Sequence, residues 1–402
     1  MNIIFIHGNF PGQFKHLISN LKTVEGINTY FMTEREDIVE GVSPEIINIK
    51  PHRGASSQTH HYLCTTEECI LRGQSVIRGM MELQEKGIAI DIVICHGGMG
   101  YGLFIKDYNP KTIVISYNEW FFTEENSKAL FSEYTFDNRL TTRTRNFTTL
   151  SEIESCDLAV CPTEWQKAQF PEVYWEKLKV IYDGVDHNFF NRKEEPIRDI
   201  LIKNRETHEE FKIKEDEVIV SYATRGMEPL RCFSEFMRAI PYIVEDNKKI
   251  RIVIAGADRV AYSYKAPNEN GSWKDYELNN MPEEARSRIS FTGLLGWEDY
   301  KKLLKRSDIH CYFSEPYVLS WSFIESAACG INIATNRMCG MLEVVEEESV
   351  HWMEIKNPTD LAKSIKKAIN QKKRAQLSKS FLMRDYLQNW QDAINSTILS
   401  MR

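Results

Sequence analysis

Short apolar segments rich in Ile and Val alternate with helical patterns along most of this chain. Examples are "NIIFIH" at the start, "IDIVICHG" ending at Gly97, "DEVIVSY" ending at Tyr222 and "KIRIVIAGAD" ending at Asp258. Continuous runs of this kind are typical of parallel strands that are covered on both faces. Strands separated by helices imply βαβ units. The sequence therefore predicts an α/β fold built on doubly wound parallel sheets.

The strand-like segments fall into two sets, one from residue 1 to about 188 and one from about 217 to 351. The stretch between them, "NRKEEPIRDILIKNRETHEEFKIKED", is strongly charged and carries Pro196, which indicates a linker with a surface helix. A chain of 402 residues is also too long for one hydrophobic core. We therefore expect two domains that face each other across a cleft, with ligands at the carboxyl ends of the strands.

Composition restricts where such a protein works. The net charge of −7 favours solubility and argues against nonspecific nucleic-acid binding. No apolar run approaches the ~18 residues that a bilayer-spanning helix needs. The start, "MNIIFIHGNFPGQF", indicates a strand and a loop rather than a signal peptide. The nine cysteines are scattered without a C-x-x-C pair, which suits free thiols in a reducing compartment, so we expect a cytoplasmic protein.

One cluster of metal-ligand residue types occurs early in the chain. His60, His61, Cys64 and Cys69 lie close enough in sequence to suggest a metal site. No matching second pair of ligands follows them, whereas structural zinc sites usually combine two such pairs. The sequence therefore predicts no metal and no cofactor.

The stretch "SEPYVLSWSFIESAACG", from Ser314 to Gly330, follows a strand-like run and predicts a loop and then a helix. Ser320 or Ser322 would cap that helix. A helix N-terminus offers free N–H groups and positive potential to a phosphate or a sugar hydroxyl. Glu325 is expected in the first turn, where its carboxylate could accept hydrogen bonds from a diol such as ribose. The alternative is that Glu325 only complements the helix dipole.

Two further strand ends carry polar groups. Arg225, Gly226 and Arg231 follow a strand in "SYATRGMEPLRCFSEF". Two guanidinium groups there suit a diphosphate, although two surface arginines on a loop are the alternative. Near the start, "HGNFPGQF" predicts a strand, a turn and a helix that begins near Gln13. Gly12 would let the backbone approach a bound anion, although a turn glycine without a ligand explains it equally well.

The glycines that follow His96, in "CHGGMGYGLF", form no G-x-G-x-x-G motif, which disfavours a nicotinamide site. His96 could instead point into the cleft from the end of its strand, or serve a structural role. Glu119 follows the next strand among aromatic residues, in "ISYNEWFF", which suits a sugar platform or core packing. A basic set, Arg139, Arg143 and Arg145, could face an anionic acceptor.

Taken in order, these stretches resemble the GT-B glycosyltransferases of the large family-4 group of retaining enzymes, the glycosyl transferases group 1. The resemblance covers nearly the whole chain. It rests on "CPTEWQKAQFP", "IYDGVDHNFF", "ATRGMEPLRCFSEFMRAIP", "IVIAGAD", "FTGLLGWEDYKKLLKRSDIHCYFS", "VLSWSFIESAACG" and, for one bacterial branch, "HGGMGYGLFIKDYNPKTIVISYNEWFF". It implies a Rossmann-like N-terminal acceptor domain (1–190), a Rossmann-like nucleotide-sugar domain (191–378) and a C-terminal helix (379–402) that returns to the N-domain.

The resemblance also implies roles for single residues. Glu325 matches the second glutamate of an E-x7-E motif that holds ribose hydroxyls. Arg225 and Arg231 match the two cations that grip the diphosphate, Gly12 matches a loop glycine beside it, and His96 resembles a residue near the reacting sugar. The further expected donor contacts are Gln13, Gly256, Leu319, Ser320, Ser322 and, along the base, Gly293 and Leu294.

The chain departs from the family pattern at three places. Tyr317 stands where the first glutamate of E-x7-E is expected, and Glu315, two positions earlier, could replace it. The usual Lys is shifted by one position and is Arg231. Where many relatives carry a second His, this chain has Tyr117 or Glu119. The residues expected to be catalytic are His96, Glu119 and Glu315.

The resemblance implies a hexosyl- or pentosyltransferase that moves a hexose or related sugar, with retention, from a UDP- or GDP-sugar to an acceptor hydroxyl. Arginines and helix N–H groups can stabilise a leaving diphosphate without a metal. The chain also lacks the D-x-D feature of metal-dependent transferases. A sugar-nucleotide epimerase and a non-catalytic nucleotide-sugar-binding partner subunit stay open as alternatives. So do the sugar, the oligomeric state and the acceptor, which could be a glycan, a lipid-linked saccharide, a protein side chain, a small metabolite or a modified nucleic-acid base. A peripheral membrane acceptor also stays open.

Overall fold

The computed structural model describes residues 1–37, 44–193 and 198–401, so Pro196 of the charged linker lies outside the described residues. The chain forms two compact units. Unit 1 comprises residues 1–127, 134–184 and 383–402, and unit 2 comprises residues 128–133 and 185–382. Each unit is built around its own parallel sheet, which confirms the predicted pair of doubly wound α/β domains.

Unit 1 contains a seven-stranded sheet in the order β3-β2-β1-β4-β5-β6-β7, in which all neighbours are parallel. The strands are β1 (Asn2–Ile6), β2 (Asn28–Thr33), β3 (Glu45–Asn48), β4 (Ile92–His96), β5 (Ile113–Tyr117), β6 (Leu158–Cys161) and β7 (Leu178–Val180). The strand order reverses between β1 and β4, and such switch points are where open α/β sheets bind ligands.

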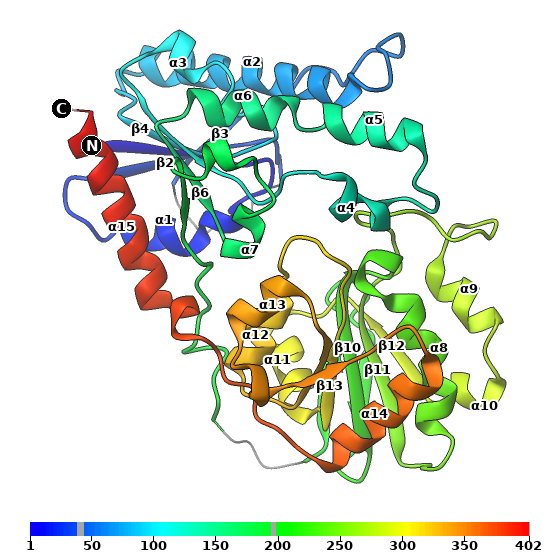
Figure 1. Ribbon diagram of the computed structural model, residues 1–402. Helices are drawn as coiled ribbons and strands as arrows, with labels where there is room; N and C mark the ends of the chain where they lie inside the picture. The colour runs from blue at the N-terminus through cyan, green and yellow to red at the C-terminus, as the bar shows by residue number, and fades with distance from the viewer. Residues whose placement is uncertain (38–43, 194–197, 402) are drawn as a thin grey trace. The chain divides into compact units, whose positions relative to one another are not determined.

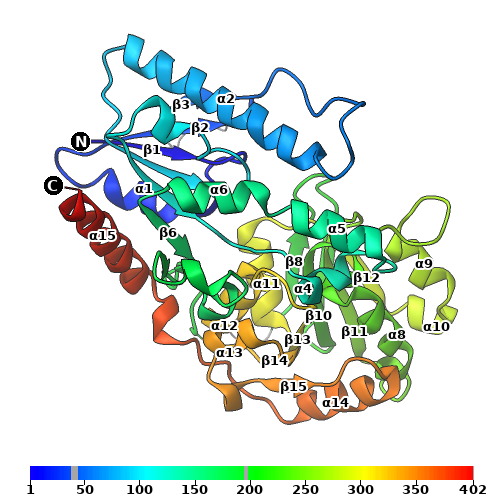
Figure 2. The same ribbon diagram turned by 45° about the horizontal axis from the view of Figure 1, so that its top comes forward.

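Alternate residues of β1 supply two separate cores on the two faces of this sheet. Ile4 and Ile6 pack with α2 (Cys64–Glu85), whereas Ile3 and Phe5 pack with α1 (Lys15–Leu21). All four of these side chains are fully buried, and each contributes about 1.5–3 kcal/mol relative to exposure. Figures 1 and 2 show α2 and α1 on opposite sides of the strands. Burial on both faces explains why the strands lack polar alternation.

The remaining helices of unit 1 are short, apart from the last one. They are α3 (Ile105–Tyr108), α4 (Glu124–Ser127), α5 (Phe136–Thr144), α6 (Phe147–Ser155), α7 (Glu164–Lys167) and α15 (Met383–Ser400). The C-terminal helix α15 belongs to unit 1, and its Tyr386, Trp390 and Ile394 are buried in the same core as α1. Figure 1 shows α15 in red beside α1. The predicted return of this helix to the N-terminal domain is therefore confirmed.

Unit 2 contains a six-stranded parallel sheet in the order β12-β11-β10-β13-β14-β15. Its strands are β10 (Val218–Gly226), β11 (Ile250–Ala257), β12 (Ile289–Gly293), β13 (Ile309–Tyr312), β14 (Ile333–Asn336) and β15 (His351–Met353). The order reverses between β10 and β13. The switch point of unit 2 therefore lies where the loops after those two strands begin.

Helices cover both faces of the second sheet. They are α8 (Phe233–Val244), α9 (Trp273–Asn279), α10 (Glu283–Arg286), α11 (Trp297–Arg306), α12 (Trp321–Ala328), α13 (Cys339–Val344) and α14 (Pro358–Asn370). Val220 and Tyr222 of β10 pack with α8 and α14, whereas Ile219 and Ala223 pack with Leu303 of α11. The alternation along one central strand again separates two cores.

The linker differs from its prediction in one respect. The charged stretch was expected to hold a surface helix, but its described part forms an antiparallel pair, β8 (Ile200–Lys203) and β9 (Glu210–Ile213). Ile202 and Ile213 are fully buried against β10 and α11, while the charged neighbours lie outside. Apolar and charged residues alternate in β9, and in β8 the exposed Leu201 and Lys203 flank the buried Ile202, so both segments have the period of two of a half-buried strand.

Candidate active site

His7 directly follows β1, and its ring packs against the turn that contains Gly12. The backbone N–H of Asn9 donates a hydrogen bond to Nδ1 of His7 (2.8 Å). Gly12 has φ +54°, and a Cβ there would lie 2.7–2.9 Å from three ring atoms of His7, so only glycine fits. Burial, and then the neighbouring His96, lower the pKa of His7 to about 3. His7 is therefore a neutral imidazole at neutral pH.

Glu119 lies two residues beyond β5 and accepts two side-chain hydrogen bonds. Gln13 donates from Nε2 to Oε1 (2.7 Å), and Nε2 of His96 lies 3.2 Å from Oε2. Burial acts to raise the pKa of Glu119, but His96 and then Gln13 outweigh it and hold the pKa below its ordinary value. Glu119 is thus an ionised carboxylate, and the structure brings together His96, Glu119, Gln13 and Gly12 as one cluster at the switch point of unit 1.

The second nitrogen of His96 is the open position of this cluster. His96 is buried, and its Nδ1 has no hydrogen-bond partner among the described residues. Its ring meets that of His7 edge to face, with centroids 4.8 Å apart. A buried polar atom without a partner is costly, so it marks a place where a ligand hydroxyl would be favourable.

The glycine-rich loop after β4 is occupied by a carboxylate of the chain itself. Glu152 of α6 is buried and accepts hydrogen bonds from the backbone N–H groups of Gly98 (2.5 Å) and Gly102 (2.7 Å). Burial raises the pKa of Glu152 to about 7, against the opposing effect of these backbone donors. The loop is therefore a fixed support for His96, and its N–H groups are not free to hold a phosphate.

Arg231 holds the corresponding position at the switch point of unit 2. It lies at the end of a short 3₁₀ segment after β10, and its guanidinium donates to Oη of Tyr312 (3.1 Å), Oγ of Ser314 (2.7 Å) and the carbonyl of Val318 (3.4 Å). These acceptors are all neutral, and no carboxylate pairs with this half-buried cation among the described residues. Such a guanidinium is ready to bind an anion.

Arg225 is exposed at the end of β10, and a second loop positions it. Its Nη1 donates to Oη of Tyr262 (3.1 Å). The loop that carries Tyr262 is held by Glu228, which is fully buried and accepts from the N–H groups of Tyr262 (2.9 Å) and Ser263 (2.7 Å). The two arginines expected to meet a diphosphate thus lie on one connected segment, which runs from the end of β10 to the start of α8.

Tyr317 stands where a glutamate was expected. It lies near Arg231 and near Tyr262, the hydrogen-bond partner of Arg225. Its ring lies 5.3 Å from that of Tyr262, and the Arg231 guanidinium carbon lies 5.9 Å from its centroid. The carboxylate of Glu315 has no hydrogen bond or ion pair to any described residue. Burial raises the pKa of Glu235, and the nearby Glu315 carboxylate adds a smaller increase. The chain therefore gives Arg231 aromatic neighbours rather than a counter-ion.

Glu325 lies on α12 without a partner. Ser320 caps this helix by accepting from the N–H of Ser322 (3.3 Å). Glu325 was expected in the first turn, which is wrong: α12 begins at Trp321, so Glu325 lies in the second turn, where the helix dipole is weaker. The side chain is 8% exposed, and its carboxylate has no hydrogen bond or ion pair among the described residues. Burial raises the pKa of Glu325 to about 8.

Tyr300 relates Glu325 to the arginine cluster. Its hydroxyl lies 2.8 Å from Oγ of Ser322. Burial, then Glu325, and less strongly Tyr312, raise the pKa of Tyr300 well above its ordinary value. Tyr312 is also a partner of Arg231. Arg231 and Glu325 lie on the segments that follow β10 and β13, the two strands at the switch point of unit 2.

The other expected donor contacts lie on strand ends of the same unit. Gly256 is on β11, and Gly293 ends β12 with φ +65°. A Cβ on Gly293 would collide with Nδ2 of Asn204, which directly follows β8, so this position has no room for a side chain. The carbonyl of the next residue, Leu294, accepts from the N–H of Arg205 (2.8 Å). Leu319 is buried immediately before the α12 cap.

Two family models match this chain. Residues 25–190 match the glycosyl transferase family 4 group, and residues 203–380 match the glycosyl transferases group 1. Together these two matches cover most of both units.

The chain belongs to the glycosyl transferases group 1 family. Solved structures with the same fold include HepE from Anabaena in complex with UDP and glucose, with a TM-score of 0.65 and 14% identity over 98% of this chain and 100% of HepE. Sucrose-phosphate synthase from Thermosynechococcus elongatus gives a TM-score of 0.64 and 12% identity over 100% of both chains. The two-domain GT-B fold expected from the sequence is confirmed.

One characterised relative of this group 1 glycosyltransferase matches only a short part of the chain. The GPI3 subunit of the phosphatidylinositol N-acetylglucosaminyltransferase of Saccharomyces cerevisiae is 22% identical over 133 residues. That match spans 33% of this chain and 27% of the yeast protein.

Three site residues of this group 1 glycosyltransferase were not predicted from its sequence: His7, Glu152 and Glu228. His7 is the last residue of "NIIFIH", a run that indicates a strand, and a polar residue at the carboxyl end of a strand was its available signal. Glu152 and Glu228 lie in segments whose apolar spacing is irregular, and only the fold brings them to their N–H partners.

Neither a metal cluster nor a membrane span is evident in the described ranges. Within residues 1–37, 44–193 and 198–401, no three His, Cys, Asp or Glu side chains are grouped as metal ligands would be. His60 and His61 stack on each other, and the Cys69 thiol faces the carbonyl of Gly98 (3.7 Å). Over the same ranges, every helix is too short or too polar to cross a bilayer.

Proposed function

We propose that this protein is a retaining glycosyltransferase that moves a hexose or related sugar from a nucleotide-diphosphate sugar to an acceptor hydroxyl without a metal. Unit 2 holds the nucleotide diphosphate, and unit 1 supplies groups that act on the sugar and the acceptor. The family assignment supports sugar transfer, and solved neighbours that contain UDP favour a UDP-sugar over a GDP-sugar.

The proposal rests mainly on one observation: the segments after β10 and β13, the two strands at the switch point of unit 2, carry a cation without a counter-ion and a buried carboxyl group without a hydrogen-bond donor among the described residues. Arg231 donates only to neutral described atoms, and Glu325 contacts no described donor. Leaving both groups unsatisfied costs stability unless a ligand completes them. A diphosphate next to a ribose diol has the acceptors and donors that this pair requires.

The reaction follows from the chemistry of such a ligand. The bond between the anomeric carbon and the diphosphate breaks, and its electron pair stays on the phosphate oxygen. Arg225, Arg231 and the N–H groups of the α12 N-terminus stabilise that charge, which in other transferases a metal would do. The acceptor hydroxyl bonds to the anomeric carbon on the same face and gives its proton to the leaving phosphate oxygen. The products are the retained glycoside and the nucleoside diphosphate.

In unit 1 we assign His96 to the donor sugar. Its Nε2–H is held by ionised Glu119, so its Nδ1 is the atom left to accept a hydrogen bond from a sugar hydroxyl. Glu119 fixes that tautomer and adds negative charge near the oxocarbenium-like sugar. Glu315 keeps its proposed role as a replacement for the missing first glutamate, because its carboxylate is likewise without a described partner.

Free cysteines support a reducing compartment. The free thiols include those of Cys64, Cys69, Cys95, Cys156, Cys161, Cys232 and Cys311, and all of these except Cys64 are buried. Disulfides persist in oxidising compartments and are rare in the cytosol. We therefore assign the protein to the cytoplasm.

A direct test combines binding and turnover. A panel of UDP- and GDP-sugars is screened for a rise in melting temperature, because a ligand that binds only the folded state stabilises it. The best donor is then incubated with candidate acceptors, with and without EDTA, and the anomer of the product is identified by NMR. An α-linked product from an α-linked donor, unchanged by EDTA, is the expected result.

The same experiment separates the alternatives. Binding of a nucleotide sugar without hydrolysis or transfer to any acceptor would indicate a non-catalytic partner subunit. A new nucleotide-sugar isomer in the absence of acceptor would indicate an epimerase. An inverted product would contradict the retaining mechanism.

A further inference from the structure

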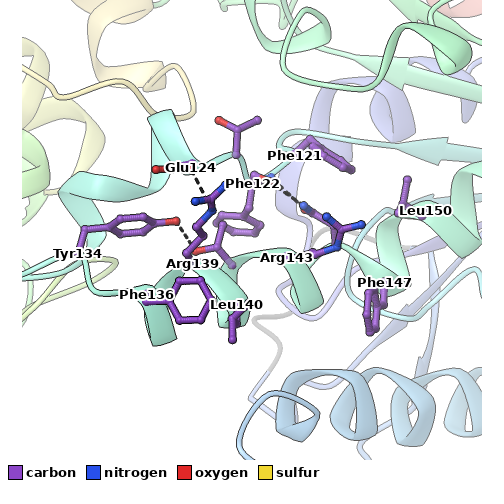
Figure 3. A pocket seen from close by; sticks show the side chains of 13 residues that line it. Phe121, Phe122, Glu124, Tyr134, Phe136, Arg139, Leu140, Arg143, Phe147 and Leu150 are labelled. Atoms are coloured by element: carbon purple, nitrogen blue, oxygen red, sulfur yellow. Dashed lines mark hydrogen bonds and ion pairs between the residues drawn. The ribbon is translucent and has the colours of Figure 1, made fainter.

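Unit 1 contains a pocket that the donor chemistry above does not use. It has a volume of about 700 Å³ and lies between the segment that follows β5 and the helices α5 and α6. Its residues all belong to unit 1. Figure 3 shows aromatic side chains from both segments around it, together with Arg139 and Arg143.

The lining combines solvent-exposed aromatic rings with cationic side chains that attract anions. Phe136 is 71% exposed and Phe147 is 45% exposed, although both are large apolar side chains. Phe121 and Phe122 add two half-buried rings on the other side. Exposed aromatic surface around a hollow is characteristic of a binding site, and ring faces suit the apolar faces of sugars.

Of the two arginines that line this pocket, Arg139 has a carboxylate partner and Arg143 has none among the described residues. Arg139 pairs with Glu124 (3.1 Å), and both side chains are exposed, so that pair is weak. Arg143 has no side-chain hydrogen bond or ion pair among the described residues and is exposed. The pocket thus offers one arginine whose guanidinium is available to a carboxylate or a phosphate.

The pocket is shaped in advance by a hydrogen-bonded frame. Asn146, between α5 and α6, accepts from the N–H of Phe122 (2.9 Å) and donates to its carbonyl (2.7 Å). The guanidinium of Arg145 lies 3.9 Å from the centroid of the Phe122 ring. Thr135 caps α5 in a capping box with Asn138. A frame of this kind lowers the entropy lost when a ligand binds.

The pocket also lies close to Glu119 along the chain. Phe121 and Phe122 follow Glu119 by two and three residues, so they lie within about 10 Å of it at full extension. Gln166 fixes the start of this segment by donating from Nε2 to the carbonyl of Glu119 (2.6 Å). A ligand about as long as a disaccharide, bound in this pocket, would therefore be long enough to reach the His96–Glu119 cluster.

We propose that this pocket binds the acceptor and that the acceptor is an acidic saccharide. A sugar ring stacks on the exposed rings of Phe136 and Phe147, and a carboxylate or phosphate on the saccharide pairs with Arg143. This inference rests on the proposed transferase function, because it assigns the second substrate of the same reaction.

The test uses small probes and ligand-observed NMR. Methyl β-glucuronide carries the carboxylate, glucose 6-phosphate carries the phosphate, and methyl β-glucoside is the neutral match. We expect at least one acidic probe to bind the wild-type protein about tenfold more tightly than the glucoside, since a charge-assisted hydrogen bond contributes more than a neutral one. Which acidic probe binds identifies the acid.

Matched variants locate the binding. Arg143→Gln is expected to weaken the acidic probe about tenfold, and Phe136→Ser to weaken all probes. Arg384→Gln and Leu399→Ser, at exposed positions of α15 that do not line the pocket, are expected to leave binding unchanged. Circular dichroism checks that each variant is folded. Equal binding by Arg143→Gln and Arg384→Gln, equal affinity for acidic and neutral probes, or no binding of either acidic probe would each overturn the proposal.

The two proposals fail separately. Melting-temperature shifts with nucleotide sugars report on the donor site, which belongs to unit 2, and the acidic probes report on unit 1. Loss of the first with survival of the second would contradict the transferase function while leaving an acidic-saccharide pocket. The reverse would leave a transferase whose acceptor binds elsewhere.

Discussion

The Nε2 atom of His96 lies 3.2 Å from Oε2 of Glu119, with the imidazole buried and the carboxylate held ionised. Neighbouring parallel strands create this pair, because β4 ends at His96 and β5 ends two residues before Glu119. The pair fixes which nitrogen of His96 faces away from the carboxylate. It is therefore the relationship on which the role of unit 1 depends.

Disruption of this pair should affect turnover more than donor binding. We expect Glu119→Gln and His96→Ala each to lower kcat by about 10²–10³ with a small change in donor Kd, which is the range for removing an acid–base or positioning group. The double variant should be little worse than either single one, because the two residues act as a unit. Additive losses in a double-mutant cycle would show that they act independently.

Glu325→Gln should stabilise the empty protein and weaken the donor. The pKa of Glu325 is raised to about 8 when the site is empty, above its value in the unfolded chain. The folded state thus binds a proton that the unfolded state has lost, so stability falls as pH rises from about 4.5 to 8, by up to roughly 1.4 kcal/mol per unit. The glutamine variant should show a smaller decline, because the part due to Glu152 remains, and it should bind UDP at least tenfold more weakly.

Thermal unfolding between pH 5 and pH 9 measures the decline, and calorimetry measures UDP binding. Glu348→Gln, at an exposed position, is the control and should behave as wild type in both. A variant that keeps the wild-type pH slope would mean that another group causes it.

Tyr317→Glu should weaken donor binding, although it restores the family pattern. The Tyr317 ring lies 5.9 Å from the Arg231 guanidinium, so a carboxylate at this position would become the counter-ion that Arg231 lacks. That ion pair would compete with the diphosphate, and we expect UDP to bind about tenfold more weakly. Tyr317→Phe should bind UDP as the wild type does. Tighter binding by Tyr317→Glu would show that the glutamate contacts the donor directly.

Glu152→Gln should loosen the glycine-rich loop that carries His96. The carboxylate accepts from two backbone N–H groups, whereas a glutamine amide offers one acceptor and turns a donor toward the other N–H. Leaving that buried N–H unsatisfied should cost about 1–3 kcal/mol. Hydrogen exchange of residues 97–102 should rise, and kcat should fall with the donor Kd unchanged. Unchanged exchange in this loop would contradict the assignment.

Most of the fold could be predicted from the sequence, because parallel strands buried on both faces give continuous runs of Ile and Val. It also singled out His96 and Glu119, which lie at or just after the ends of successive strands, but their hydrogen bond was not predicted and appears only in the structure. Arg225 and Arg231 were singled out in the same way. Their short spacing after β10 keeps both at one edge of the sheet.

What the sequence missed depends on contacts between distant segments. Glu152 acts on a loop about 50 residues earlier, and Glu228 acts on Tyr262, so neither has a local signal. The expected first-turn position of Glu325 failed because Ser320 caps the helix. The expected linker helix failed because burial of Ile202 and Ile213 outweighed the charged composition around them.

The most direct test of the central claim is a crystal structure of the protein with UDP bound. The account predicts that the diphosphate contacts Arg231 and Arg225 and that both ribose hydroxyls donate to the Glu325 carboxylate. UDP bound at any other place, or a Glu325 carboxylate that remains without a ligand contact in the complex, would contradict it.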